Sequence, residues 1–202
     1  MSIFSKVLVY TLVLALIAAI GLWVMGGSKN ESEGSVEIKA SPEEVFKVLI
    51  EPAQRQKWLW NVTNVEMKSR PPIAPNSTYL SQHLEKGKTF ETNDQVLQMV
   101  PPEWLSIRMG SVSSNLVTMF KLAPAGSQTS LKYKVSQTPT NLFRLLAPLR
   151  KVDLQGRVDE ELIRIKRLVE QSNQAGENQP PAVEPGEENP AEAQPPLKGS
   201  ES

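Results

Sequence analysis

The sequence has no cysteine and only one histidine, His83, among its 202 residues. The missing cysteines exclude disulfides, thiol nucleophiles, thiolate metal sites and lipid attachment to a thiol, but they do not identify the compartment. A single histidine excludes metal sites built on two histidines, including the HExxH motif. The sequence also lacks a glycine-rich phosphate loop and any basic cluster interleaved with aromatic residues. We therefore predict no cofactor, no metal and no nucleic-acid partner.

The net charge is zero, but the two signs are unevenly distributed along the chain. Residues 174–202 hold six glutamates and one lysine, a net charge of −5, so residues 1–173 carry +5. Residues 173–202 are rich in Pro, Glu, Gln, Gly and Ala, with Val183 and Leu197 as the only large apolar residues. This composition predicts a disordered tail, because little apolar burial is available to offset the entropy of ordering. A solvated spacer and a docking peptide that uses the Pro-Pro pairs both fit this segment.

One long apolar run, Val7 to Met25, contains no charged residue. At ~1.5 Å per residue its nineteen residues span about 28 Å as a helix, close to the ~30 Å hydrocarbon core of a bilayer. We predict an uncleaved transmembrane anchor over residues 1–27, followed by a tether over residues 28–34; a cleaved signal peptide or a buried core helix is the alternative. A single-pass membrane protein is expected. The positive-inside count, which includes the amino terminus and Lys6, favours a domain outside the cytoplasm.

The middle of the chain alternates between short strands and turns. A strand is expected at residues 35–40, then a helix that Ser41 and Glu44 start with a capping box, then a short helix from Pro52 through Trp58. Lys86-Gly87-Lys88 is typical of a tight hairpin. Short connections between strands predict an antiparallel sheet. The further strands are expected at residues 62–68, 78–85, 89–100, 104–110, 116–122 and 131–135.

The segment from Thr140 to Gln171 has apolar residues at helical spacing, so it predicts a long amphipathic helix that packs on the sheet. Pro148 fits either the first turn of this helix or a kink within it. Acid–base pairs four residues apart, Asp153 with Arg157 and Glu160 with Arg164, are typical of a solvated face. Gly156 inside the helix indicates either a close approach to the strands or a break in the helix, and we favour the close approach.

The order of these elements, and the amino-acid sequences of two segments, resemble those of the START-like (SRPBCC) superfamily. The opening VEIKASPEEVFKVLIEPAQRQKWLWNVTNVE contains the small-residue-Pro-Glu-x-Val-Phe pattern, followed by a tryptophan before the second strand. The end, from Leu131 to Glu170, is similar to that superfamily's closing strand and helix. The resemblance covers residues 35–172 and implies an α+β helix-grip fold. In that fold a curved seven-stranded antiparallel sheet wraps a long C-terminal helix, two short helices lie between strands 1 and 2, and an apolar cavity separates helix from sheet.

We expect this cavity toward the N-terminal half of the long helix. Its predicted lining is Trp58, Met109, Phe120, Tyr133, Leu142, Leu145, Leu146 and Leu149, with Trp58 also open to interpretation as a packing residue. His83 is expected on the outer face of its strand, because Leu80 and Leu84 alternate with it. Asp94 and Arg108 are interpreted as solvated strand residues, with a buried pair as the alternative.

The leading functional hypothesis is a membrane-tethered, non-catalytic domain that binds or transports an apolar small molecule or lipid. A second hypothesis is an enzyme resembling the polyketide cyclase/dehydrase branch, which would need polar groups converging inside the cavity, such as His83 with a carboxylate. A third is a protein-interaction module whose interior is packed shut. The sequence names no catalytic residue, because no nucleophile lies at a recognisable spacing from His83.

Overall fold

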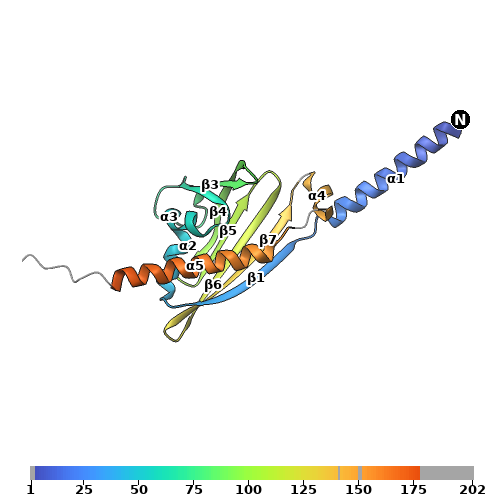
Figure 1. Ribbon diagram of the computed structural model, residues 1–202. Coiled ribbons are helices and arrows are strands. Elements are labelled where there is room, and N and C mark those ends of the chain that lie inside the picture. Colours follow the sequence, from blue (N-terminus) through green and yellow to red (C-terminus); the bar gives the residue numbers. More distant parts are fainter. Residues whose placement is uncertain (1–2, 141, 150–151, 178–202) are drawn as a thin grey trace, which may run out of the picture.

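The computed structural model describes residues 3–140, 142–149 and 152–177, and it confirms the predicted α+β fold (Figure 1). A seven-stranded antiparallel sheet carries a long C-terminal helix, and two short helices lie between its first two strands. The helices are α1 Ile3–Met25, α2 Pro42–Ile50, α3 Pro52–Trp58, α4 Phe143–Leu146, the 3-10 turn η1 Ala147–Leu149 and α5 Leu154–Glu177. The strands are β1 Asn30–Ile38, β2 Val62–Met67, β3 Thr78–Glu85, β4 Lys88–Val100, β5 Trp104–Gly110, β6 Ser114–Ala125 and β7 Gln128–Pro139.

The strand order of the sheet is β1-β7-β6-β5-β4-β3-β2, so the first and last strands of the chain pair with each other. All other neighbours are consecutive in the sequence, as short connections between antiparallel strands predict. The β3–β4 hairpin turns at Lys86 and Gly87, both with positive φ, 50° and 77°. Two positive φ values match the twist of a tight hairpin, which confirms the turn expected from the sequence.

Local capping fixes the start of α2 as the sequence predicts. The Ser41 side chain accepts a hydrogen bond from the Glu44 backbone N–H, and the Glu44 carboxylate accepts one from the Ser41 backbone N–H at 2.8 Å. Pro42 occupies the first turn, where its missing N–H costs nothing. Beyond α2, the indole of Trp58 in α3 donates to the Val48 carbonyl at 3.0 Å and ties the two short helices together.

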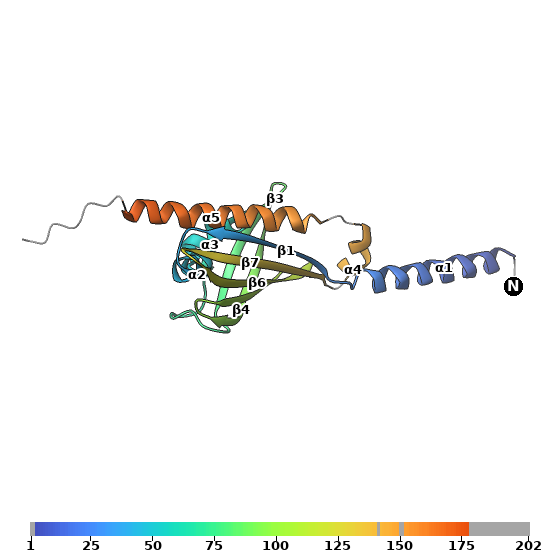
Figure 2. The same cartoon turned by 90° about the horizontal axis from the view of Figure 1, so that it is seen from below.

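Helix α5 lies across the sheet, with its apolar stripe buried against β1 and β7 (Figure 2). The closest approach involves Gly34 in β1, where an added Cβ would lie 2.8 Å from Leu162 Cδ1 and 3.1 Å from Val158 Cγ1. Glycine therefore lets the edge strand approach the helix. The buried residues of the stripe are Leu154, Val158, Leu162, Ile165 and Val169.

Two sequence-based boundaries and the interpretation of Gly156 need correction. Strand β1 begins at Asn30, so most of the expected tether is part of the sheet. The long helix begins at Leu154 rather than Pro148, because the Asp153 carboxylate accepts a hydrogen bond from the Gly156 N–H at 2.8 Å and caps the first turn there. Gly156 is exposed, and the three atoms nearest to a Cβ added there all belong to the Asp153 side chain, so its interpretation as a close approach to the strands is wrong. The predicted tail lies largely outside the described residues.

Helix α1 projects away from the domain, and none of its residues is buried. Its length and apolar composition are sufficient for a membrane span, and a signal sequence near the N-terminus would meet the same test. Its C-terminal end contacts α4: the Arg144 guanidinium lies over the Trp23 ring at 4.9 Å, and Gly26 packs on the Arg144 backbone. The α4–η1 segment therefore lies between α1 and the domain.

Candidate functional site

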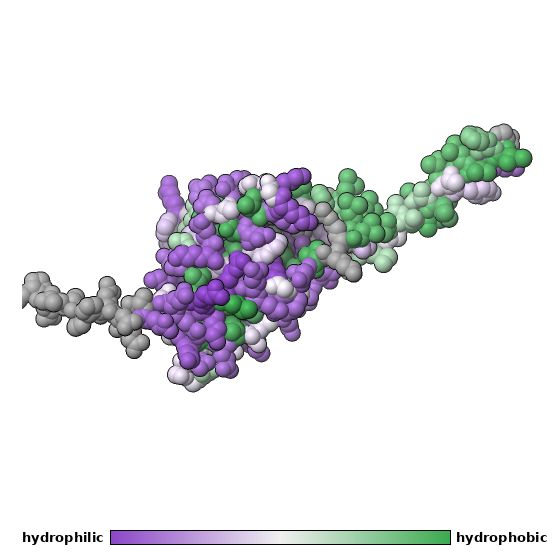
Figure 3. Space-filling model, in the orientation of Figure 1, coloured by the Kyte–Doolittle hydropathy of each residue, from purple (hydrophilic) through white to green (hydrophobic). Residues whose placement is uncertain are grey.

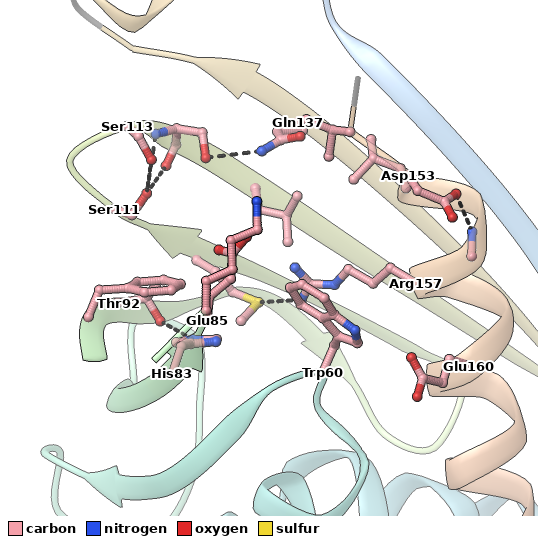
Figure 4. Close-up of a pocket in the computed structure, with 18 residues that line it drawn as sticks. Trp60, His83, Glu85, Thr92, Ser111, Ser113, Gln137, Asp153, Arg157 and Glu160 are labelled. Carbon is pink, nitrogen blue, oxygen red and sulfur yellow. Dashed lines mark hydrogen bonds between the residues drawn. The ribbon is translucent and has the colours of Figure 1, made fainter. Parts of the chain in front are cut away.

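A cavity of about 740 Å³ opens between the N-terminal part of α5 and the sheet (Figure 4). Its walls come from the β3–β4 hairpin, the β5–β6 loop, β7, the first turns of α5 and the segment before β2. The apolar lining residues are Trp60, Phe90, Met109, Leu116, Val152 and Leu154. The polar and charged ones are His83, Glu85, Lys86, Thr92, Ser111, Ser113, Ser114, Gln137, Asp153, Arg157 and Glu160, with Gly156 completing the wall.

His83 lies inside this cavity, so the expectation of an outward-facing histidine is wrong. Its Nε2 lies 3.0 Å from Thr92 Oγ1, and its ring stacks on Phe90 with 4.9 Å between centroids. The single hydroxyl hydrogen of Thr92 is donated to the Asp94 carboxylate at 2.8 Å. With its own hydrogen engaged by Asp94, Thr92 Oγ1 can accept a hydrogen bond from His83 Nε2.

Behind His83, a buried polar network extends into the core. Asp94 Oδ2 accepts hydrogen bonds from Ser81 Oγ at 2.7 Å and from Arg55 Nη2 at 3.1 Å, forming a fully buried ion pair with Arg55. The Arg55 guanidinium also lies 4.8 Å from the centre of the Tyr79 ring. Asp94 is thus half of a buried pair rather than a solvated residue, and its partner is Arg55, whereas Arg108 is exposed.

The protonation state of His83 follows from this environment. Burial is the largest effect and lowers the pKa of the imidazole below its ordinary value of 6.5, opposed by the Asp94 carboxylate and reinforced by the Arg157 cation. The side chain is therefore neutral at pH 7. A neutral imidazole in a cavity can accept a proton or a hydrogen bond from a bound molecule.

A second buried group of charges comes from α5. Arg157 Nε donates to Glu161 Oε1 at 3.0 Å, while the Tyr133 hydroxyl donates to Glu161 Oε2 and the Trp60 backbone N–H donates to Glu161 Oε1 at 2.9 Å. Burial and the Glu161 charge raise the pKa of Tyr133 well above its ordinary value, so Tyr133 stays a neutral donor. Burial opposes the charge of Arg157, but Glu161 and Tyr133 outweigh it and raise the pKa of Arg157. Arg157 thus presents a permanent cation to the cavity.

The opposite wall of the cavity carries uncharged polar groups. Gln137 Nε2 donates to Ser114 Oγ at 3.2 Å, but the buried Gln137 Oε1 has no hydrogen-bond partner among the described residues. Ser111 and Ser113 lie beside them, with their hydroxyls 3.3 Å apart. A buried acceptor without a partner costs free energy, so Gln137 Oε1 is a position where a ligand donor or a water molecule would be stabilised. Among the described residues no acidic or histidine cluster has the arrangement of a metal site.

The predicted lining residues fall into three groups. Met109 lines the cavity. Trp58, Phe120 and Tyr133 are buried in the core, where Phe120 contacts Trp58 edge-on at 5.7 Å and stacks on Tyr133 at 4.5 Å between ring centroids. The remaining four are not part of the lining, because they precede α5, in or next to the separate α4–η1 segment, which ends at Leu149. Leu142, Leu146 and Leu149 are exposed, and Leu145 is half-buried.

Three important cavity residues were not predicted as lining: Trp60, Gln137 and Arg157. The sequence did carry one signal near Arg157. Glu161 lies three residues after Val158 and four before Ile165, so it falls on the buried stripe of α5. A carboxylate on an apolar stripe needs a buried partner, and Arg157, one turn earlier in the helix, supplies it. Arg157 therefore pairs with Glu161 and not with Asp153, the partner expected from the spacing. The Glu160–Arg164 pair forms at 2.5 Å as predicted.

Comparison with solved structures shows the same fold in proteins of low sequence identity. The structure resembles Ara h 8.0201 with a TM-score of 0.55 at 13% identity, covering 73% of this chain and 99% of that one. It resembles the di-domain ARO/CYC StfQ of the steffimycin biosynthetic pathway with a TM-score of 0.57 at 14% identity, covering 74% of this chain and 54% of StfQ. A point mutant of Thalictrum norcoclaurine synthase gives a TM-score of 0.53 at 12% identity, with 72% and 97% covered.

A search of curated proteins finds no match. Residues 39–145, more than half of the 202-residue chain, match the family described as Activator of Hsp90 ATPase homolog 1-like protein. This span runs from the end of β1 to α4 and includes the sheet walls of the cavity. The chain therefore belongs to the family of Activator of Hsp90 ATPase homolog 1-like proteins, within the START-like superfamily that its sequence resembles.

Proposed function

We propose that this protein binds a small amphipathic molecule, such as a lipid or another largely apolar compound, in the cavity beneath α5, while α1 anchors it in a membrane. The observation that carries the proposal is the cavity itself. Its volume of about 740 Å³ falls in the ~300–1,000 Å³ range of small-molecule sites. An interaction module with a sealed interior would not have this opening.

The lining defines which part of a ligand each wall would contact. Met109, Leu116 and Phe90 offer apolar surface for a chain or ring. Arg157 and Gln137 Oε1 offer a fixed donor and an unpaired acceptor for polar groups. A ligand that is wholly apolar would leave the buried Gln137 Oε1 without a partner, so a molecule with an apolar body and a hydrogen-bonding end fits best.

Native mass spectrometry of the full chain, released from detergent micelles, tests this proposal through co-purified ligand, and binding of anilinonaphthalene sulfonate is the parallel assay. Met109→Trp adds an indole inside the cavity and should abolish both signals. Met99→Trp is the matched control, because Met99 is half-buried near the end of β4 and lines neither this cavity nor the second pocket, of about 500 Å³, beside Met119 and Lys132. If the wild type carries no adduct and binds no dye, or if both variants lose binding equally, the cavity is not a ligand site.

A second candidate function is catalysis, favoured by the position of His83 in the cavity together with the carboxylates of Glu85, Asp153 and Glu160 on its wall. A neutral imidazole can remove a proton from a carbon between two carbonyl groups, the first step of a dehydrating cyclisation of the kind expected of a polyketide cyclase/dehydrase-like enzyme. A synthetic linear poly-β-ketone incubated with the full chain should lose water by mass spectrometry, and His83→Gln should prevent this. Equal water loss with and without protein would eliminate the candidate.

A further inference from the structure

The end of the domain nearest α1 exposes a group of large apolar side chains, defined here as the juxtamembrane patch: Val112, Leu142, Leu146, Leu149 and Val152. Val112 is 80% exposed, and Leu142 and Leu149 are each 72% exposed. Neither α4 nor η1 has a buried residue, so core packing does not account for the leucines of this segment. The space-filling view shows apolar surface gathered where the domain meets α1, while the rest of the visible domain surface is mostly hydrophilic (Figure 3).

Two hydrogen bonds join the separate segments that carry Val112 and the leucines of the patch. Thr140, just before α4, donates from its hydroxyl to the Val112 carbonyl at 2.8 Å and from its backbone N–H to the Ser113 carbonyl at 3.0 Å. The β5–β6 loop therefore lies beside the residue that leads into the α4–η1 segment. Val152 extends the patch toward the first turn of α5.

The patch also borders the mouth of the cavity. Val152 belongs both to the patch and to the cavity wall, and Ser111 and Ser113 on either side of Val112 line the cavity as well. On its other side the patch reaches the anchor, because Arg144 in the middle of α4 stacks over Trp23 near the end of α1. Tryptophan and arginine favour the headgroup level of a bilayer, where an aromatic ring and a cation are both stabilised.

We infer that the juxtamembrane patch lies in the surface of the bilayer that holds α1, so that the mouth of the cavity opens directly onto the lipid. This inference rests on the membrane-tethered function proposed above. The occupant of the patch is a lipid monolayer because the patch is continuous with the membrane-spanning helix. Exposed apolar side chains next to a span can enter the interface at no additional cost in chain entropy, since the anchor already holds them there. A hydrophobic ligand would then exchange between bilayer and cavity without crossing water.

Single-cysteine labelling tests the inference in the full chain, which has no native cysteine to remove. Val112→Cys and Leu149→Cys would carry an environment-sensitive nitrobenzoxadiazole label in protein reconstituted into phosphatidylcholine vesicles. Val100→Cys is the matched control: Val100 is 55% exposed at the opposite end of β4 from the cavity-lining hairpin. All three residues are exposed, so the substitutions should leave the fold intact, which circular dichroism would verify.

Labels at positions 112 and 149 should shift their emission to the blue and lose most of it when the vesicles contain nitroxide-labelled lipid, whereas the label at position 100 should do neither. Vesicle flotation separates this test from the tethering proposal: protein that fails to float refutes the anchor. Protein that floats with all three labels unquenched refutes the membrane location of the patch. A blue shift without lipid quenching would mean that a protein surface, such as a second copy of the chain, covers the patch, and it would overturn the inference equally.

Discussion

The buried ion pair between Arg55 and Asp94 provides the sharpest test of how this fold holds His83 in place. Asp94→Asn removes one charge with almost no change in side-chain volume. The Arg55 guanidinium is 1% exposed, and its Nε and Nη1 atoms have no hydrogen-bond partner within the part of the chain that the structure describes. Among the described residues its ion-pair partner is Asp94 alone, at 3.1 Å, so the variant leaves a buried cation without that counter-charge.

The expected cost is about 3–5 kcal/mol in the free energy of unfolding, which is typical when one partner of a buried pair is removed. Cation–π contacts with Tyr79 and Trp58, at 4.8 and 5.7 Å, are present in both proteins and do not offset the loss. For a domain of this size each kcal/mol shifts Tm by roughly 2–4 °C, so Tm should fall by about 10 °C. In the double variant Arg55→Met/Asp94→Asn neither charge remains, and the asparagine can still bond Ser81 and Thr92. That variant should be more stable than Asp94→Asn alone, despite its additional substitution.

The double-mutant cycle compares the wild type, Asp94→Asn, Arg55→Met and the double variant. Thermal unfolding of each full chain in detergent micelles, followed by tryptophan fluorescence, gives the four stabilities. The matched control is Asp159→Asn on the exposed face of α5, which should change stability by no more than about 0.5 kcal/mol. A Tm of Asp94→Asn equal to that of Asp159→Asn would mean that the buried ion pair does not stabilise the fold. If the stability losses of the two single variants simply add in the double variant, the two charges do not depend on each other, and the prediction is wrong.

Three further predictions concern the packing and titration of the same domain. Lowering the pH from about 7.5 to about 5 should destabilise the wild type more than His83→Gln in urea titrations. The pKa of His83 in the folded state lies below its ordinary value of 6.5, so the neutral side chain contributes its full stability above about pH 6.5. This contribution is lost as the pH falls through the folded-state pKa. Gly34→Leu should cost about 1–3 kcal/mol by overpacking against Leu162, whereas Gly156→Ala should change stability by no more than about 1 kcal/mol; equal effects would contradict the assigned contacts. Leu162→Ala and Ile165→Ala should each cost about 2–5 kcal/mol by calorimetry, and a loss below about 1 kcal/mol would mean that α5 does not pack on the sheet as described.

The sequence alone determined the elements of the fold wherever the deciding contacts are local. The Ser41–Glu44 capping box and the Lys86-Gly87 turn each involve residues at most three apart, and both formed as predicted. The alternation of the strands and the 3.6-residue spacing of α5 indicated the antiparallel sheet and its long helix. These are properties of short segments, so they can be worked out without knowing what lies across the core.

The tertiary structure decided which face of β3 is buried. Leu80 and Leu84 favoured the opposite face, yet Ser81 and His83 point inward. Their burial is stable only because Asp94 from β4 and Arg55 from α3 satisfy the polar groups, and no local pattern reveals partners that lie 13 and 39 residues apart.

The same limit explains the misplaced cavity wall. The apolar spacing runs from Leu142 into α5 without interruption in the sequence, but η1 ends at Leu149 and α5 begins separately at Leu154, where Asp153 caps its first turn. The leucines that precede α5 therefore do not share its packing on the sheet, and α4 contacts α1 instead. Spacing identifies which residues share a helical face, whereas the position of that face depends on where the backbone turns and on what distant segments pack against it.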